Sequence, residues 1–188
     1  MMEYNTLIKN RRSIRSFTKE KVSPDILTEI LQETCMAPSA SNGQPWNFIV
    51  ITDQTIIKKL SDESKKNLVK IIENDPNSSI KQYESFLRNP NSNVFYDAPC
   101  LVYIVGQNNH YHFPHDCSLA AAYFMFAATA RNLGTCWIGL GEDIVDEKLK
   151  MEIGLPNDYQ IAAAIIIGHP RKIPSIAPRD KPKVLKII

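Results

Sequence analysis

The sequence predicts a β-sheet covered by helices on both faces, built within one domain. Segments with a helical spacing of apolar residues alternate along the chain with short runs of branched and aromatic residues, a pattern typical of layered architectures. The chain has 188 residues, enough for one substantial core but too few for two ordinary domains. We therefore expect a single domain over residues 1–188.

The first elements expected are two helices and a strand. Residues 3–10 can begin a helix, and Ser23 caps a second helix that has Pro24 in its first turn. This second helix is expected to run to Pro38. Residues 46–51 then combine branched and aromatic side chains, which favours a strand.

A longer helix is expected over residues 54–72, capped by Asp53, with apolar residues on one side and lysines on the other. Residues 74–93, which follow, are rich in Pro, Asn and Ser. This is the most loop-like part of the chain, and both a variable lid over a substrate and a plain connector fit its composition.

The second half contains a helix that is apolar on nearly every face. We expect Asp116 to cap it, the helix to cover residues 117–133, and Gly134 to end it. A helix that is apolar all round is buried all round. Because a domain of this size encloses few such helices, we expect a second subunit to cover part of it.

The last elements expected are a short helix over residues 143–153 and a continuous apolar strand over residues 159–168, placed centrally in the sheet. The tail over residues 170–188 is rich in proline, which favours an extended chain. Its last five residues are apolar except for one lysine, so they need a partner surface.

Composition excludes several classes of protein. A hydrophobic content of 44%, a charged content of 22% and a net charge of +2 are typical of a globular protein without a general attraction to nucleic acid or membranes. No run approaches the roughly 18 apolar residues of a membrane span, and residues 1–10 lack the apolar core of a secretion signal. We expect a cytoplasmic protein with no nucleic-acid or membrane partner.

The four cysteines are widely spaced and form no Cys-x-x-Cys motif, so they predict reduced, buried thiols rather than a disulfide framework. They are Cys35, Cys100, Cys117 and Cys136.

Two segments carry candidate binding residues. Residues 11–15 contain three arginines and a serine, which suit a phosphate. Residues 38–46 present the amides of Asn42 and Gln44 and an indole on a loop shaped by prolines and a glycine. One segment can hold charge, and the other can recognise a heterocyclic ring.

Several further segments follow along the chain, and their order is itself informative. They are Tyr96-Asp97-Ala98-Pro99 before an apolar strand, the long apolar helix near residues 116–134, Trp137-Ile138-Gly139-Leu140-Gly141 and a late Arg179. With the two binding segments, this order resembles the FMN-dependent nitroreductase family from about Tyr4 to the C-terminus. The resemblance implies an α+β fold, a three-layer α/β/α sandwich whose central sheet is mixed and mainly antiparallel. It also implies a homodimer that exchanges the C-terminal arm, residues 170–188.

The resemblance implies FMN as the cofactor, and the lack of a glycine-rich nucleotide-binding motif agrees with this. No Gly-x-Gly-x-x-Gly or P-loop motif follows a predicted strand, so side chains must hold the nucleotide, and arginines match a terminal phosphate. The expected cofactor-binding residues are Arg11, Arg12, Ser13, Arg15, Pro38, Ser39, Ala40, Asn42, Gln44, Ile138, Gly139, Leu140, Gly141, Arg179 and Lys181.

Roles within this set follow from chemistry and from the resemblance. Arg11, Arg15 and Arg179 are expected at the phosphate, with Arg12 and Lys181 as alternates, and whether Arg179 or Lys181 holds it is left open. Asn42 is expected near the reactive side of the ring, where a donor stabilises negative charge.

The backbone of residues 138–141 is expected on the far side of the ring. Glu142 follows, and the resemblance places it near the ring's other face, although a solvated carboxylate is the simpler expectation. No side chain is expected to act as a catalytic acid or nucleophile, because the flavin carries the chemistry.

The implied activity takes a hydride from NADH or NADPH and passes electrons to a small-molecule acceptor, such as a nitroaromatic or a quinone, by a ping-pong mechanism. Dehalogenation, ring dehydrogenation, and a flavin carrier or sensor without turnover remain alternatives.

A histidine-rich run over residues 110–117 invites a metal-site interpretation. Pro114 interrupts this run and Asp116 is wanted as a helix cap, so no metal site is predicted. Cysteine–histidine nucleophilic catalysis lacks a third, orienting group. Nucleic-acid binding through residues 11–15 is disfavoured by the small net charge.

Overall fold

The computed structural model of the chain describes residues 3–107 and 111–188. At its centre is a four-stranded antiparallel sheet with the order β1-β2-β4-β3. The strands are β1 (Asn47–Ile51), β2 (Cys100–Gln107), β3 (Gly134–Trp137) and β4 (Tyr159–Gly168). A single parallel bridge from Ser13 to Thr135 adds the arginine-rich segment to the β3 edge. The predicted mixed, mainly antiparallel sheet is therefore confirmed.

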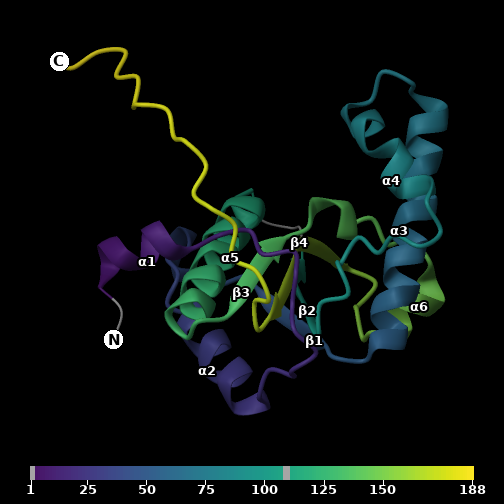
Figure 1. Cartoon of the computed structure of the whole chain (residues 1–188), viewed down its shortest axis with the longest axis horizontal. Coiled ribbons are helices and arrows are strands. Elements are labelled where there is room, and N and C mark those ends of the chain that lie inside the picture. The colour runs from purple at the N-terminus through teal and green to yellow at the C-terminus, as the bar shows by residue number, and fades with distance from the viewer. Residues whose placement is uncertain (1–2, 108–110) are drawn as a thin grey trace.

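Helices cover both faces of this sheet, which gives three layers (Figure 1). The longer helices are α2 (Pro24–Thr34) and α5 (Phe113–Ala130) on one face and α3 (Gln54–Asn74) on the other. The short helices are α1 (Tyr4–Asn10), α4 (Glu84–Arg88) and α6 (Glu147–Glu152), and the 3-10 turns are η1 (Ala40–Asn42), η2 (Ser79–Tyr83) and η3 (Gly139–Gly141). The predicted α/β/α sandwich is confirmed.

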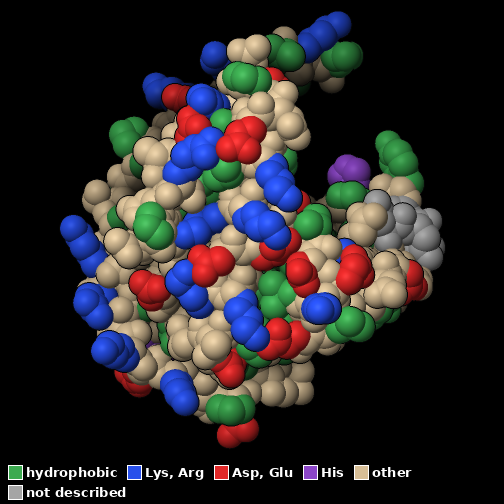
Figure 2. Space-filling model, turned by 90° about the vertical axis from the view of Figure 1, so that its right-hand side faces the viewer, with side chains coloured by type: hydrophobic (Ala, Val, Ile, Leu, Met, Phe, Trp, Pro, Cys, Tyr) green, Lys and Arg blue, Asp and Glu red, His purple; other side chains and the backbone are tan. Residues whose placement is uncertain are grey.

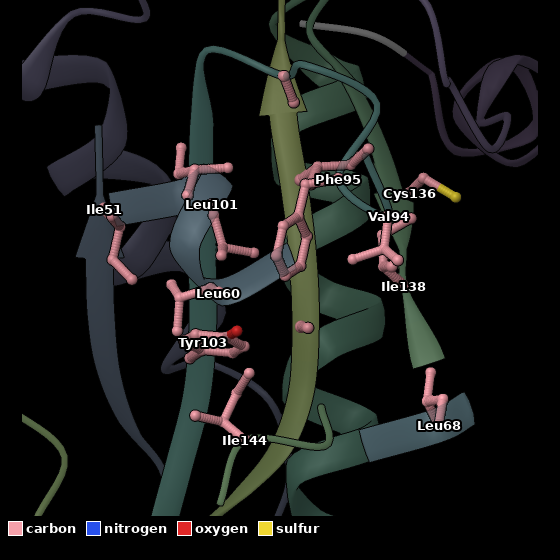
Figure 3. Packing of buried hydrophobic residues seen from close by; sticks show 14 of the residues in the cluster. Ile51, Leu60, Leu68, Val94, Phe95, Leu101, Tyr103, Cys136, Ile138 and Ile144 are labelled. Carbon is pink, nitrogen blue, oxygen red and sulfur yellow. The ribbon is translucent and has the colours of Figure 1, made fainter. Parts of the chain in front are cut away.

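The two central strands are buried on both faces, which explains their continuous apolar sequences. Alternate residues of β2 serve alternate layers: Leu101 and Tyr103 pack toward α3, whereas Val102 and Ile104 pack toward α2 and α5. Figure 3 shows Leu101 and Tyr103 in the layer that also holds Leu60 of α3. The prediction that residues 159–168 form a central strand is confirmed.

Two predicted helix starts are confirmed by their caps. The Ser23 hydroxyl accepts a hydrogen bond from the Asp25 N–H at 3.3 Å, and the Asp53 carboxylate accepts one from the Thr55 N–H at 2.7 Å. Helix α2 ends earlier than expected, at Thr34 rather than near Pro38.

The start of α5 was predicted wrongly. The helix begins at Phe113, with Pro114 in its first turn, where a missing N–H costs nothing. Asp116 therefore lies inside the first turn and is not the cap. Its buried carboxylate instead accepts a hydrogen bond from the Ala40 N–H at 3.1 Å.

The end of α5 also differs from the prediction. The helix ends at Ala130, and Asn132, with φ of 60°, takes the left-handed position that was expected of Gly134. Gly134 begins β3 instead, where an added Cβ would lie 2.7 Å from Cγ1 of Ile14. A glycine is required there by close packing.

One face of α5 is open in this chain, since Leu119 is 42% exposed and Tyr123 is 40% exposed. That a second subunit covers this face stays a prediction. None of the described helices has both the length and the apolar character needed to cross a membrane.

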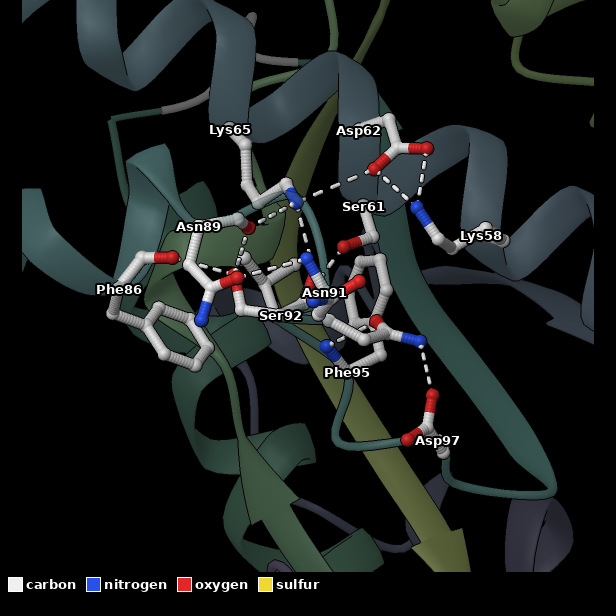
Figure 4. A network of polar contacts seen from close by, with 12 residues as sticks. Lys58, Ser61, Asp62, Lys65, Phe86, Asn89, Asn91, Ser92, Phe95 and Asp97 are labelled. Atoms are coloured by element: carbon white, nitrogen blue, oxygen red, sulfur yellow. Dashed lines mark hydrogen bonds and ion pairs between the residues drawn. The ribbon is translucent and has the colours of Figure 1, made fainter.

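Residues 74–93 are more structured than a plain connector, because they contain η2 and α4. The ammonium group of Lys65, which is 7% exposed, donates to the carbonyls of Asn89 at 3.1 Å and Ser92 at 2.8 Å (Figure 4). Arg88 adds an ion pair with Glu73 at 3.0 Å. These contacts fix the segment against α3.

The C-terminal arm leaves the body of the molecule as an extended chain (Figure 1). Residues 171–188 are exposed, including the apolar side chains of Val184, Leu185, Ile187 and Ile188. Exchange of this arm in a dimer stays a prediction.

The cysteines are all free thiols, as expected. Three of them are buried, but Cys35 is exposed, because it follows directly after α2 at the surface. For Cys35 the predicted burial was wrong.

Candidate functional site

The arginine-rich segment runs extended along the edge of β3, so its side chains alternate between two sides. The Ile14 N–H donates to the Thr135 carbonyl at 2.8 Å, and the Ile14 side chain is buried in the core. Arg11, Ser13 and Arg15 all act on the thiol of Cys136. Burial raises the pKa of this thiol, while the Arg15 charge, a Ser13 hydrogen bond and the Arg11 charge favour the thiolate. The structure thus brings these three predicted residues together.

Arg12 lies apart from them. With Asn10 and Ile14 it lines a separate cavity of about 260 Å³. Its guanidinium donates to the Arg11 carbonyl at 2.7 Å, and its Nε is buried without a partner among the described residues. The extended conformation separates Arg12 from the neighbouring arginines.

The end of β3 and the η3 turn are held by buried groups from other elements. The Ile138 N–H donates to the Ala164 carbonyl at 2.8 Å. The Ser64 hydroxyl of α3 donates to the Leu140 carbonyl, and the Tyr103 hydroxyl of β2 donates to the Gly141 carbonyl at 2.9 Å. Burial of Tyr103, aided by the Glu142 charge, raises the pKa of this phenol, which keeps it a donor.

The two glycines of η3 have different reasons to be glycine. An added Cβ at Gly141 would lie 2.3 Å from Cε1 of Phe95, a fully buried ring. An added Cβ at Gly139 would meet nothing within 4 Å. Gly141 is required by the core, whereas Gly139 leaves open space above the backbone.

A cavity of about 320 Å³ adjoins this backbone; we call it the β3 cavity. It is lined by Arg15, Leu68, Ile80, Tyr83, Val94, Tyr96, Trp137, Ile138, Gly139 and Leu140. Six of these, the five from Leu68 to Tyr96 and Trp137, were not among the expected cofactor-binding residues. They come from α3, from residues 80–96 and from the end of β3, and their meeting at one cavity depends on tertiary contacts.

Tyr96 is the most constrained of these wall residues. Tyr96 and Asp97 have φ of 54° and 52°, a left-handed conformation that is rare outside glycine. The Tyr96 ring stacks on Phe86 at a centroid distance of 6.1 Å, and Cζ of Arg15 lies 5.7 Å from the Tyr96 centroid. This turn fixes both an aromatic wall and the position of Arg15.

Glu142 is half-buried rather than fully solvated, which corrects the simpler expectation. Its carboxylate accepts a hydrogen bond from the Trp137 indole at 2.5 Å. Burial raises the pKa of Glu142, although the indole and the Ala164 backbone favour the ionised form. The carboxylate thereby fixes the orientation of Trp137 in the wall of the β3 cavity.

The loop over residues 38–44, which we call the amide loop, is shaped by contacts among its own residues. Ser41, Asn42 and Gln44 have φ of 51°, 55° and 43°. The Gln44 amide donates to Oδ1 of Asn42 at 3.1 Å, and the Gln44 N–H donates to the Ser39 hydroxyl at 3.0 Å. Asn42 and Gln44 remain exposed, available to a ligand or another surface.

The amide loop and the β3 cavity lie at opposite edges of the sheet. β1, which the loop precedes, pairs only with β2, and β3 pairs only with β4, among the strands of the described chain. Three steps of about 4.8 Å separate these edges by roughly 14 Å. Within the part of the chain that the structure describes, no residue of the amide loop lines the β3 cavity. One chain therefore does not bring together the predicted ring-binding amides and the predicted phosphate-binding arginines.

Arg179 and Lys181 are exposed on the extended arm. Neither lines the β3 cavity in the described part of the chain. A contact of either side chain with the FMN phosphate stays a prediction.

The histidine-rich run contains an aromatic cluster in its described portion. Tyr111 and His112 have ring centroids 5.0 Å apart, and His112 and His115 have centroids 6.2 Å apart. A group of three or more potential metal ligands is not found among the described residues, and His110 lies outside them.

Comparisons with known proteins bear on the family and on the fold. The model of the nitroreductase family matches residues 8–169. An Archaeoglobus fulgidus protein named "Putative NADH dehydrogenase/NAD(P)H nitroreductase" is 25% identical over 179 residues, covering 91% of this chain and 87% of that protein. Iodotyrosine deiodinase 1 of Sus scrofa is 23% identical over 183 residues, covering 90% of this chain and 62% of that protein.

A crystal structure of a nitroreductase with bound FMN from Desulfitobacterium hafniense superposes with a TM-score of 0.83 at 23% identity and covers 100% of both chains. The likeness extends over every layer of the sandwich and shows that the two proteins share a fold.

Proposed function

The chain belongs to the nitroreductase family, and on that premise we propose that it is an FMN-dependent oxidoreductase. It takes a hydride from NADH or NADPH and passes electrons to nitroaromatic, quinone or similar acceptors by a ping-pong mechanism. The observation that carries this proposal is that Arg11, Ser13 and Arg15 alternate along an extended segment beside Cys136 of β3, and that Arg15 reaches a cavity with open backbone at Gly139.

The residues present fit FMN. Arg11, Ser13 and Arg15 offer guanidinium and hydroxyl donors to the phosphate, and the space above Gly139 admits a flat ring close to the backbone. Arg179 and Lys181 of the arm are the further candidates for the phosphate. Arg12 is the weakest candidate, because it faces another cavity.

FMN, when bound, supplies hydride acceptance and electron transfer. The protein's own part is to hold and tune it. Asn42 and Gln44 present amides that can both donate to and accept from the pyrimidine edge of the ring, and a donor from Asn42 stabilises negative charge there. Pro38, Ser39 and Ala40 line the same edge, and residues 138–141 hold the opposite side.

The active unit is proposed to be a homodimer. The amide loop and the β3 cavity lie at opposite edges of one chain, so a complete site needs the loop of one subunit to meet the cavity of its partner. The exposed face of α5 at Leu119 and Tyr123 and the apolar end of the arm offer surfaces for such an assembly.

Residues 74–93 are proposed to select the acceptor. Ile80 and Tyr83 from this segment line the β3 cavity beside Tyr96. Aromatic and branched walls favour flat, apolar acceptors over highly charged ones.

Reductive dehalogenation is a second candidate, favoured by the likeness to iodotyrosine deiodinase 1 of Sus scrofa. In this case the acceptor would be a halogenated aromatic ring in the same cavity. Release of halide from iodotyrosine by the anaerobically reduced protein would distinguish this activity from nitroreduction.

The test is the visible absorption spectrum of the purified protein, followed by anaerobic addition of NADH or NADPH and then of a quinone or a nitroaromatic compound. We expect flavin bands that bleach with one donor and return with the acceptor, and parallel double-reciprocal plots in steady state. A colourless protein that FMN does not reconstitute would contradict the cofactor. If neither NADH nor NADPH bleached the bound flavin, the protein would instead be a flavin carrier or sensor without turnover.

A further inference from the structure

A second cavity, of about 560 Å³, adjoins the β3 cavity; we call it the basic cavity. It is lined by residues 15–19 and Lys21, by Thr52 and Gln54 around the start of α3, by Tyr96, Asp97 and Pro99 of the turn before β2, and by Arg171. Arg15 and Tyr96 line both cavities. The cation–π pair of these two residues therefore stands between the two cavities.

The charge in the basic cavity is strongly one-sided. Arg15, Lys19, Lys21 and Arg171 line it, against the single carboxylate of Asp97. Within the described ranges, none of the four cations makes an ion pair with a carboxylate. Asp97 itself accepts a hydrogen bond from the Asn93 amide at 2.9 Å. Arg15 is shared with the proposed FMN site, but Lys19, Lys21 and Arg171 have no other assigned partner, and together they create a positive potential that is focused by the cavity walls.

The face formed by α3 behaves differently, which shows that a lysine-rich surface need not be a site. Figure 2 shows basic and acidic side chains interspersed there. A cavity on that face is lined by Lys65, Lys66, Lys70 and Arg88. Three of these cations are paired: Lys65 with Asp62 at 3.5 Å, Lys66 with Glu63 at 3.2 Å and Arg88 with Glu73 at 3.0 Å.

The walls of the basic cavity are fixed by backbone contacts. The Arg171 N–H donates to the Ser16 carbonyl at 2.9 Å, and the Thr18 N–H donates to the His169 carbonyl at 2.9 Å. The Gln54 amide donates to the carbonyls of Ala98 and Pro99, both at 3.2 Å, beside the left-handed Tyr96 and Asp97. Strained, non-glycine turns of this kind cluster at ligand sites, because the surrounding structure must sustain their cost.

We propose that the basic cavity binds the pyrophosphate of the nicotinamide dinucleotide that donates the hydride. This inference rests on the proposed function and specifies where its donor docks. Lysine and arginine side chains are the usual partners of phosphate where a chain has no glycine-rich phosphate loop. The volume is within the range of small-molecule sites. Because the cavity adjoins the β3 cavity, a dinucleotide held by its phosphates can extend its nicotinamide toward the flavin site.

The direct test is calorimetric titration of the FMN-loaded protein with ADP, which carries the pyrophosphate but no nicotinamide. The test variant is Lys19→Gln/Lys21→Gln, since both side chains are exposed and their loss leaves the core intact. The matched control is Lys66→Gln/Lys70→Gln on α3. We expect the test variant to weaken ADP binding by about 10-fold or more and the control to leave it unchanged.

Kinetics supply the second readout. The test variant should raise KM for the dinucleotide with kcat and FMN affinity unchanged, because the lost contacts hold the donor equally before and during hydride transfer. Failure of ADP to bind the wild type, or equal binding by both variants, would overturn the inference. So would a rise in KM for an anionic acceptor with KM for the donor unchanged.

The identity of the donor and the place where it docks can be disproved separately. If NADH and NADPH both leave the bound flavin oxidised, the proposed donor is wrong. If one of them bleaches the flavin and ADP neither binds nor competes with it, only the docking site is wrong.

Discussion

The two halves of the candidate site are held in place by different means. The η3 turn beside the β3 cavity depends on distant parts of the fold, because its carbonyls accept hydrogen bonds from Ser64 of α3 and Tyr103 of β2, both buried. The amide loop depends mainly on itself, with one outside contact from Ala40 to Asp116.

The two halves also differ in how far a single chain completes them. The half built on the core is preformed within one chain. The amide loop holds three non-glycine residues in left-handed conformations and presents exposed amides at the other edge of the sheet. Such strain on an open surface is consistent with a loop that meets a ligand and a partner.

The largest effect is expected on FMN binding, from substitution of an arginine in residues 11–15. Arg11→Gln should weaken FMN binding by roughly 10- to 100-fold, through loss of a charged hydrogen bond worth about 1.5–3 kcal/mol. Arg12→Gln is the matched control, because Arg12 faces a separate cavity. Fluorescence titration of the apoprotein with FMN would measure both. If both variants lost the same affinity for FMN, the two sides of this extended segment would not differ in their access to the phosphate, and the preference for Arg11 over Arg12 would be wrong.

Substitution of the two glycines of η3 tests how strongly the core holds the backbone beside the β3 cavity. Gly141→Ala should lower the free energy of unfolding by about 1–3 kcal/mol, because its Cβ would overlap the buried Phe95 ring. Gly139→Ala should change the free energy of unfolding by less than about 0.5 kcal/mol and weaken FMN binding instead. Chemical denaturation of the apoproteins separates the effects. A destabilised Gly139 variant would mean that the space above this residue is not free.

Removal of residues 183–188 tests whether the end of the arm contributes to the proposed dimer. The exposed apolar end of the arm should bury surface on the partner, so its deletion should raise the dimer dissociation constant by about 10-fold or more. Sedimentation velocity at several concentrations measures this change. A truncated chain that stays dimeric with full flavin content would remove the arm from the interface.

The smallest effect is expected on the free energy of unfolding, from substitution of Glu142. Because its folded pKa is raised, its ionised form costs stability at neutral pH, and this cost disappears as the pH falls through the folded pKa and then the unfolded pKa. Glu142→Gln should therefore stabilise the apoprotein by about 0.5 kcal/mol at pH 7, with the gain vanishing at acidic pH. Denaturation across pH 4 to 8, in roughly unit steps, follows this change. A gain that persists at the acidic end would point to packing rather than charge.

Local signals in the sequence predicted much of the fold. The Ser23 and Asp53 caps and the apolar strands β2 and β4 were recognisable because each depends on residues within a few positions. Asp116 was misassigned because its partner, Ala40, lies 76 residues away in the chain. Extent as a single domain remains a prediction.

The site was predictable in part. The arginine segment and residues 137–141 were visible as motifs, and the structure joins them through the bridge between Ser13 and Thr135. The walls at Ile80 and Tyr83 were not, because their place depends on Lys65 holding the carbonyls of a loop with no signature of its own. Tyr96 was visible as part of a motif, but its role as a cavity wall was not predicted. The separation of the two halves follows from strand order, which no local motif encodes.

In the proposed homodimer, each complete site combines the β3 cavity of one chain with the amide loop of the other. A mixed dimer of an Arg11→Gln/Arg15→Gln chain and an Asn42→Ala chain tests it, with stopped-flow bleaching of the flavin by NADH or NADPH as the measurement. We predict one FMN per dimer that bleaches at the wild-type rate, because one site draws only on unaltered residues. A single bound FMN that bleaches slowly, as in the Asn42→Ala homodimer, would place the whole site within one chain and contradict the account.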